Sequence, residues 1–220
     1  MMSAKLLDTI NEYKPDAIIM CHPFVTTMIS KLRRQHKIDV KAISLITDYD
    51  AHRTYIVPYV DAYVLAEPDM ATKLIDEYGV DESIIYPLGI PIFDRFTEPF
   101  DKKAICEREG LDPNKPTILL MAGSFGVTSV LSFYKALAQR ASEMQFIVIT
   151  GRNIKLFANL EKLVEEMGMQ DNTKLLYFVK NVEDYMHISD LIVTKPGGLT
   201  VTESLACSLP MAIYRARRCV

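Results

Sequence analysis

The sequence contains little that would suit a metal centre, a disulfide framework or a membrane span. Its four cysteines, Cys21, Cys106, Cys207 and Cys219, include no Cys-x-x-Cys pair, and their spacings match no zinc site. Cys21 and Cys207 stand among apolar residues, where we expect core thiols, as in a protein of a reducing compartment. No apolar run approaches the length that a membrane-spanning helix requires.

The first residues, Met-Met-Ser-Ala-Lys, lack the apolar segment of a signal peptide. Together with the missing membrane span, this predicts a cytoplasmic protein. Any action on a lipid would then have to take place at the inner surface of the cell membrane.

The sequence also lacks an excess of positive charge. Its formal net charge is −3 and no long basic block occurs, so we do not expect nucleic acid as a partner. The densest basic cluster contains Lys31, Arg33, Arg34, His36 and Lys37. This cluster is typical of a solvated helix end, and the less favoured alternative is a surface for anionic lipid.

Two familiar phosphate-binding fingerprints are missing as well. No Gly-x-Gly-x-x-Gly occurs, which argues against the usual dinucleotide site, and no glycine turn is followed by Gly-Lys-Ser or Gly-Lys-Thr, which excludes a P-loop. A phosphate site, if there is one, must therefore use another kind of glycine turn.

Such a turn lies at residues 194–203, with the sequence Thr-Lys-Pro-Gly-Gly-Leu-Thr-Val-Thr-Glu. An apolar run precedes it and a helical pattern follows, so the order is strand, turn, helix. Pro196 cannot continue a strand, and two glycines leave space beside a helix N-terminus, which attracts phosphate. A structural alternative stays open, because Thr200 and Glu203 have the spacing of a capping box.

The rest of the chain alternates short apolar segments with helical patterns, which predicts parallel sheets covered on both faces. We expect strands at residues 16–21, 40–47, 62–66, 84–86, 117–121, 145–150, 174–179, 191–193 and 210–214, and helices at 4–13, 24–35, 69–78, 101–109, 128–140, 154–167 and 182–187, with one more after the turn. The predicted domains are 1–98 and 116–220, joined by a connecting stretch at 99–115.

The second half contains two glycine turns where predicted parallel strands end, at residues 123–126 and 196–198. Open α/β sheets bind ligands beyond the carboxyl ends of their strands. The two turns together therefore favour a ligand site more strongly than either turn alone.

Six segments in one order resemble a known family. They are Ile-Thr-Asp-Tyr-Asp-Ala-His at 46–52, Gly-Ile-Pro at 89–91, Ala-Gly-Ser-Phe-Gly-Val at 122–127, Thr-Gly-Arg-Asn at 150–153, Phe-Val-Lys-Asn-Val at 178–182 and the turn at 194–203. Together they resemble the bacterial diacylglycerol glucosyltransferases and the plant monogalactosyldiacylglycerol synthases, which are relatives of the glycosyltransferase that makes lipid II. The resemblance covers nearly the whole chain.

This resemblance implies a GT-B fold, with two Rossmann-like domains, and transfer of a hexose from a UDP-sugar to diacylglycerol. The donor would be UDP-glucose or UDP-galactose, and no other cofactor is expected. The implied donor-binding residues are Gly123 and Ser124 at the diphosphate, Phe178 and Val179 beside the uracil, Gly197, Gly198 and Thr200 at the helix N-terminus, and Glu203 at the ribose hydroxyls. Taken singly, Ser124 could be a turn residue and Phe178 a core aromatic.

On the acceptor side, Asp48 or His52 would orient or deprotonate the acceptor hydroxyl. The pair Asp48 and Asp50 also has the Asp-x-Asp spacing that holds a metal in another glycosyltransferase fold. The family expected here needs no metal in its chemistry, since a helix dipole and N–H groups stabilise the departing UDP. The structural alternative is a loop-capping aspartate and a surface histidine.

The sequence departs from the family pattern at both ends. It begins in a helix without the family's first strand and glycine loop, and Tyr214 is not followed by the Pro-Gly-Gln-Glu segment that contacts the donor hexose. We therefore expect an incomplete N-terminal domain, self-association through an open sheet edge, and little or no sugar transfer by these residues alone. The alternatives are a non-catalytic remnant that binds UDP, a transferase with another acceptor, and a UDP-sugar 2-epimerase.

Overall fold

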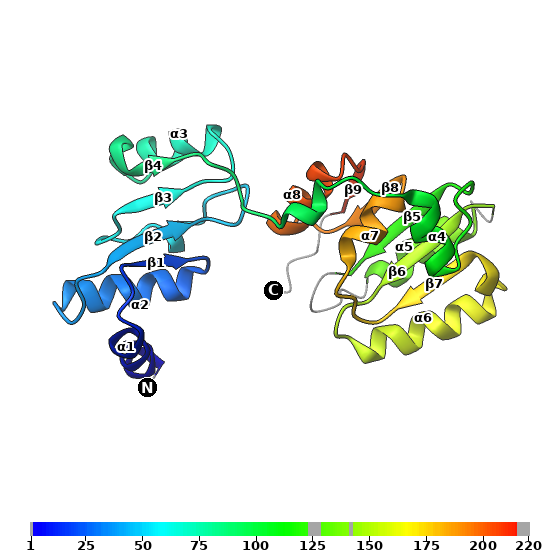
Figure 1. The fold of residues 1–220 in the computed structure, drawn as a ribbon, viewed down its shortest axis with the longest axis horizontal. Helices are drawn as coiled ribbons and strands as arrows, with labels where there is room; N and C mark the ends of the chain where they lie inside the picture. Colours follow the sequence, from blue (N-terminus) through cyan, green and yellow to red (C-terminus); the bar gives the residue numbers. More distant parts are fainter. Residues whose placement is uncertain (1, 123–128, 141–142, 215–220) are drawn as a thin grey trace. The chain divides into compact units, whose positions relative to one another are not determined.

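The computed structural model describes residues 2–122, 129–140 and 143–214. The chain divides into two compact units, Met1–Pro91 and Ile92–Val220. Each unit has a parallel β-sheet with helices packed on it (Figure 1). The predicted α/β class with two Rossmann-like, parallel-sheet domains is thereby confirmed.

The first unit contains, within its described residues, a four-stranded sheet in the order β1-β2-β3-β4, with all neighbours parallel. Its strands are β1 (Ala17–Met20), β2 (Lys41–Leu45), β3 (Ala62–Val64) and β4 (Ile85–Tyr86), and its helices are α1 (Met2–Tyr13), α2 (Pro23–Arg34) and α3 (Asp69–Asp76). Each strand is placed beside the one before it, so the polar segments after the strands gather at one edge of the sheet.

Apolar side chains from strands and helices form the core of the first unit. One group joins Met20 to Ile29 of α2 and Ala42 of β2, and another joins Leu65 to Leu74 of α3. Strand β1 is an edge strand, with no described strand on its outer side. Its Ile19 side chain is 63% exposed, so part of this edge presents an apolar surface to solvent.

The sheet of the second unit has the order β7-β6-β5-β8-β9 and is parallel throughout its described strands. The strands are β5 (Thr117–Met121), β6 (Gln145–Ile149), β7 (Thr173–Leu176), β8 (Leu191–Thr194) and β9 (Met211–Ile213). The chain moves outward from β5 to β7 and then returns to the other side of β5. The boundary between β5 and β8 is thus a topological switch point, where open α/β sheets bind ligands.

Helices cover both faces of this second sheet, as the fully apolar strands require. Side chains of α5 (Ser129–Ala138) and α6 (Ile154–Glu166) pack on one face with Leu120 and Phe146. Side chains of α4 (Lys102–Glu109) and α7 (Val182–Ile188) pack on the other face with Leu119 and Ile147. The last helix is α8 (Gly198–Ala206), which lies between β8 and β9 in the chain.

The division between the units differs from the predicted domains, which placed a connecting stretch at residues 99–115. The structure divides the chain between Pro91 and Ile92. Phe96, Ile105 and Cys106 are buried against the second sheet, and this burial makes the predicted connector part of the second unit. Its prolines and charges had suggested a linker, but Ile105, Cys106 and Leu111 are apolar and pack in the core of the second unit.

Two cysteines also differ from expectation. The predicted core thiol Cys21 is exposed, because it follows β1 at the edge of the first sheet, and Cys207 is only partly buried. Among the three cysteines that the structure describes, Cys106 of α4 is buried. The apolar neighbours of Cys21 in sequence lie on the strand before it and do not surround it in space.

Candidate functional site

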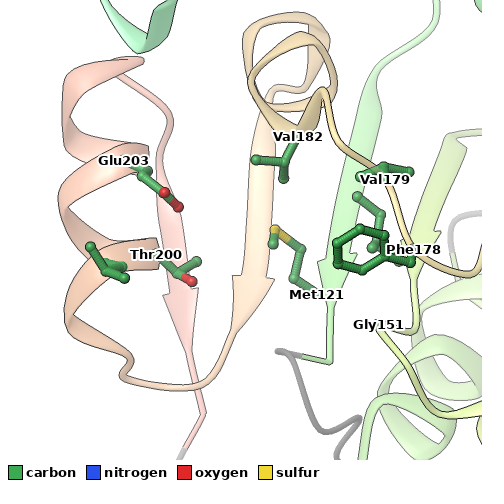
Figure 2. A pocket seen from close by; sticks show the side chains of 9 residues that line it. Met121, Gly151, Phe178, Val179, Val182, Thr200 and Glu203 are labelled. Carbon is green, nitrogen blue, oxygen red and sulfur yellow. The ribbon is translucent and has the colours of Figure 1, made fainter. Parts of the chain in front are cut away.

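A pocket lies at the carboxyl ends of the second sheet, at the switch point between β5 and β8 (Figure 2). Its volume is about 240 Å³. The lining residues come from the ends of β5 and β6, the loop after β7, and helices α7 and α8: Met121, Ile149, Gly151, Phe178, Val179, Val182, Leu199, Thr200 and Glu203. Four of the eight donor-binding residues implied by the resemblance, namely Phe178, Val179, Thr200 and Glu203, therefore meet in one cavity.

Helix α8 begins at Gly198, directly after the glycine turn, and Gly197 is its N-cap residue. Neither glycine has a positive φ, so the backbone angles of this turn do not require glycine. The space expected beside the helix is present, because a Cβ on Gly197 would meet no atom closer than the Lys195 Cε at 4.0 Å. The turn leaves open space at the positive end of the helix.

The capping-box alternative for Thr200 and Glu203 is excluded by the position of the helix start. Thr200 is already inside α8, and no side chain caps the first N–H groups of that helix. Both side chains are therefore free of that local role. Figure 2 shows them on α8, across the pocket from Phe178 and Val179.

The Glu203 carboxylate is only partly exposed, and no described residue forms a hydrogen bond with it. Burial raises the pKa of Glu203 to about 7; the Arg95 cation opposes this shift and the Glu183 anion adds to it. A half-buried acceptor without a protein partner can accept hydrogen bonds from hydroxyl groups of a ligand.

Phe178 follows β7, which ends at Leu176, three residues before the end of the predicted strand that included Phe178. Its ring is 50% exposed, so the alternative of a core aromatic is wrong. The Arg152 guanidinium lies over this ring, 4.8 Å from the ring centroid. An exposed aromatic face beside a cavity can stack on a flat heterocycle.

The other implied donor residues lie apart from this lining. Gly123 and Ser124 fall outside the described residues, and Gly197 and Gly198 form the start of α8 without lining the pocket. Sequence reasoning missed Arg95 and Glu183, whose charges act on Glu203. They come from distant parts of the chain, so no local spacing could have identified them.

On the first unit, the two candidate catalytic residues make different contacts. The Asp48 carboxylate accepts a hydrogen bond of 3.4 Å from the Tyr55 hydroxyl, and burial together with the Asp48 charge raises the pKa of Tyr55. His52 is the N-cap of a 3-10 turn, where its Nδ1 accepts from the Thr54 backbone N–H at 3.3 Å. A neutral His52 in this arrangement has its proton on Nε2, which leaves no free base on the ring.

The Asp-x-Asp alternative finds no support in this arrangement. Asp50 pairs with Lys73 of α3, whereas Asp48 bonds with Tyr55. Within residues 2–122, 129–140 and 143–214, no group of three histidine, cysteine, aspartate or glutamate side chains could hold a metal ion. The same part of the chain contains no helix that is long and apolar enough to cross a membrane.

A pocket of this kind, at the switch point of a parallel sheet and beside a helix N-terminus, is typical of nucleotide-sugar transferases with two Rossmann-like domains. Family models agree with this class. The model for glycosyl transferases group 1 matches residues 101–218, and the model for monogalactosyldiacylglycerol (MGDG) synthase matches residues 1–92. The chain therefore belongs to the glycosyltransferases of group 1. Its first 92 residues are also similar to MGDG synthases.

Similar proteins support the same family. The processive diacylglycerol beta-glucosyltransferase of Staphylococcus carnosus is 35% identical over 208 residues, which are 94% of this chain and 52% of that protein. The protein of the same description from Staphylococcus epidermidis is 34% identical over the same shares. The chain thus spans about half the length of the curated relatives it matches.

Solved structures with the same fold are more distant in sequence. The Anabaena protein HepE, in complex with UDP and glucose, matches with a TM-score of 0.64 at 14% identity, over 97% of this chain and 62% of that one. MurG of Acinetobacter baumannii matches with a TM-score of 0.62 at 16% identity, over 99% of this chain and 57% of that one. UDP-GlcNAc 2-epimerase of Neisseria meningitidis matches with a TM-score of 0.63 at 16% identity, over 98% of this chain and 64% of that one. At these identities the matches show the GT-B fold alone.

Proposed function

We propose that this chain binds a UDP-hexose in the pocket of the second unit and takes part in transferring the hexose to diacylglycerol. The observation that carries the proposal is the pocket itself, where the exposed Phe178 ring faces the unpaired Glu203 carboxylate at the switch point. The names of the relatives, which are diacylglycerol glucosyltransferases, support the choice of acceptor.

Each part of the pocket suits one part of the donor. The flat uracil would stack on Phe178, with Val179 beside it, and the ribose hydroxyls would donate to Glu203. The diphosphate would lie toward Thr200 and the start of α8, where the helix dipole and free N–H groups favour negative charge. Gly123 and Ser124 would contact the same phosphates. This arrangement stabilises UDP as the leaving group without a metal ion.

For the acceptor, Asp48 is the better candidate base. Its carboxylate bonds only the Tyr55 hydroxyl among the described residues, whereas His52 uses Nδ1 to cap its own turn. Asp48 would accept the proton of the diacylglycerol hydroxyl as the sugar is transferred. His52 would then orient the loop that carries Asp48.

The lipid acceptor implies contact with a membrane surface. Three large apolar side chains, Phe24, Tyr49 and Leu88, are exposed and follow the carboxyl ends of β1, β2 and β4, on the same edge of the sheet as Asp48. They would enter the interfacial region of the inner face of the cell membrane. Sedimentation with diacylglycerol-containing vesicles should therefore deplete the chain from solution, and Phe24→Ser with Leu88→Ser should weaken this depletion.

Donor binding tests the proposal first. We expect UDP-glucose or UDP-galactose to bind the folded chain, and ADP-glucose to bind at least tenfold more weakly, because a purine does not fit the site of a uracil. Binding should be unchanged by EDTA. Equal affinity for the adenine and uracil nucleotides would contradict the proposed donor.

Transfer tests the acceptor. Radiolabelled UDP-glucose and UDP-galactose are incubated with diacylglycerol in mixed micelles, and lipid-soluble label is measured for this chain and for a version extended to the length of its relatives. We expect label in lipid from the extended version, lost in Asp48→Asn. Conversion of UDP-GlcNAc to its 2-epimer, without label in lipid, would favour the epimerase alternative instead.

A further inference from the structure

A short segment at the start of the second unit is attached to the two helices that carry the pocket. It contains the 3-10 turn η3 (Asp94–Phe96), shortly after Pro91, where the first unit ends. The Cys207 thiol of α8 donates to the Phe96 carbonyl at 3.4 Å, and the His187 Nε2 of α7 lies 3.1 Å from the Arg95 carbonyl. With the buried Phe96 ring, these bonds fix the backbone at Arg95. Cys207 lies one helical turn after Glu203, and its backbone N–H donates to the Glu203 carbonyl at 3.0 Å. The segment that carries Arg95 is therefore held beside the turn of α8 that carries Glu203.

The Arg95 side chain is fixed as well. Its Nε lies 3.2 Å from Glu183 Oε2, and its guanidinium carbon lies 4.3 Å from the centroid of the Phe93 ring. The Glu183 side chain is only 15% exposed, so this ion pair is partly shielded from solvent on the α7 side. An arginine held by both a carboxylate and an aromatic face has a defined direction.

Two charges of the described residues act on the Glu203 carboxylate, and they come from η3 and α7. Arg95 of η3 favours its ionised form, and Glu183 of α7 disfavours it. On α8 itself, burial and the nearby carboxylates raise the pKa of the Cys207 thiol to about 11, so that group is neutral near pH 7. The pocket side is apolar, with Met121 and Val182. Arg95 is therefore the one cation that acts on Glu203 among the described residues.

We propose that Arg95 is a positioning residue of the donor pocket, which favours the ionised form of the Glu203 carboxylate and so its ability to accept hydrogen bonds from the ligand. Arg95 does not line the pocket, and it acts through charge. The inference rests on the proposed function, in which the ligand is a UDP-sugar and Glu203 accepts from its ribose hydroxyls. It links a segment next to the boundary between the units to the strength of donor binding.

Removing the Arg95 guanidinium should raise the pKa of Glu203 in two ways. A half-buried carboxylate loses its cation, and Glu183 becomes an unpaired anion nearby, so both changes favour the protonated form of Glu203. Arg95→Lys retains a positive charge at that place and should keep the pKa of Glu203 near its wild-type value. Glu183→Gln removes the opposing anion and should lower the pKa of Glu203.

The first experiment needs no ligand. Carbon NMR of the labelled glutamate carboxyl groups in the full chain gives the titration midpoint of Glu203, assigned by its absence in Glu203→Gln. We expect Arg95→Met to raise this midpoint by about one pH unit, Arg95→Lys to leave it near the wild-type value, and Glu183→Gln to lower it. An unchanged midpoint in Arg95→Met overturns the proposal.

The second experiment measures the UDP affinity of wild type and the same variants between pH 6 and pH 9. The phosphate of UDP titrates identically in every sample, so it cancels when a variant is compared with wild type. We expect Arg95→Met to weaken binding about fivefold at pH 7 and to recover near pH 9, where Glu203 ionises in both proteins. Equal weakening at every pH would show a merely structural role and overturn the proposal. If wild type binds no UDP at any pH, the proposed function fails, and the NMR titration still decides the role of Arg95.

Discussion

The Arg152 guanidinium lies 4.8 Å from the centroid of the Phe178 ring, at the rim of the pocket. Arg152 follows β6 and Phe178 follows β7, so two neighbouring strand ends supply the pair. The guanidinium holds the direction of an aromatic ring that is otherwise half exposed. The Phe178 ring is therefore presented to the cavity before any ligand binds.

Phe178→Ala should weaken UDP binding by about 1–3 kcal/mol, because base stacking on an aromatic ring contributes that much. Phe178→Tyr keeps the ring face and should bind nearly as wild type. Ile154→Ala, at another exposed apolar side chain outside the pocket, is the control. Fluorescence or calorimetric titration measures all three, and equal affinity of Phe178→Ala and wild type would remove Phe178 from the site.

Glu203→Ala should weaken UDP binding by roughly 1.5–3 kcal/mol, as expected for a hydrogen bond to a charged acceptor. Glu203→Gln preserves the shape and should lose a similar part of the affinity, since the charge is absent. Melting temperature is measured in parallel. A variant with lower melting temperature but unchanged UDP affinity would assign Glu203 a structural role alone.

Stability should also depend on pH through Glu203. Burial raises the pKa of Glu203 to about 7 in the folded chain, above the value of about 4.3 for an unfolded glutamate. The folded state thus binds the proton more tightly, and this contribution, fully present below about pH 4.3, is lost as pH rises through about 7.

Urea unfolding of wild type and Glu203→Gln at pH 5 and pH 8 measures this contribution. Relative to wild type, Glu203→Gln should gain about 1–2 kcal/mol between the two pH values, a range reduced for the partial exposure of the carboxylate. The same difference at both pH values would show that burial does not perturb Glu203.

The strands and helices could be predicted almost completely from the sequence, because apolar strands, helical periodicity and glycine turns are local signals. All the predicted strands exist, although the one expected at residues 174–179 ends at Leu176. Phe178 and Glu203 could be named as site residues only from the family resemblance, because their local patterns also fit a core aromatic and a capping box. The position of the unit boundary and the roles of Arg95 and Glu183 could not be predicted, since they depend on packing between distant segments.

The open edge of the first sheet leads to a prediction about association. Strand β1 has no described neighbour on its outer side, and Ile19 is exposed there. We expect the chain to self-associate as its concentration rises, because an unpaired apolar strand edge pairs with other chains. Ile19→Lys should shift the equilibrium toward monomer in sedimentation velocity, whereas Ile154→Lys on α6 should not. A wild-type chain that stays monomeric at high concentration would contradict this expectation.

The central claim is that the pocket of the second unit binds UDP, and isothermal titration calorimetry of the full chain with UDP tests it most directly. The account predicts saturable heat for one UDP per chain, with weaker binding in Phe178→Ala and in Glu203→Ala. The sample must first show a cooperative unfolding transition. No heat from such a folded sample, at UDP concentrations up to about millimolar, would contradict the claim.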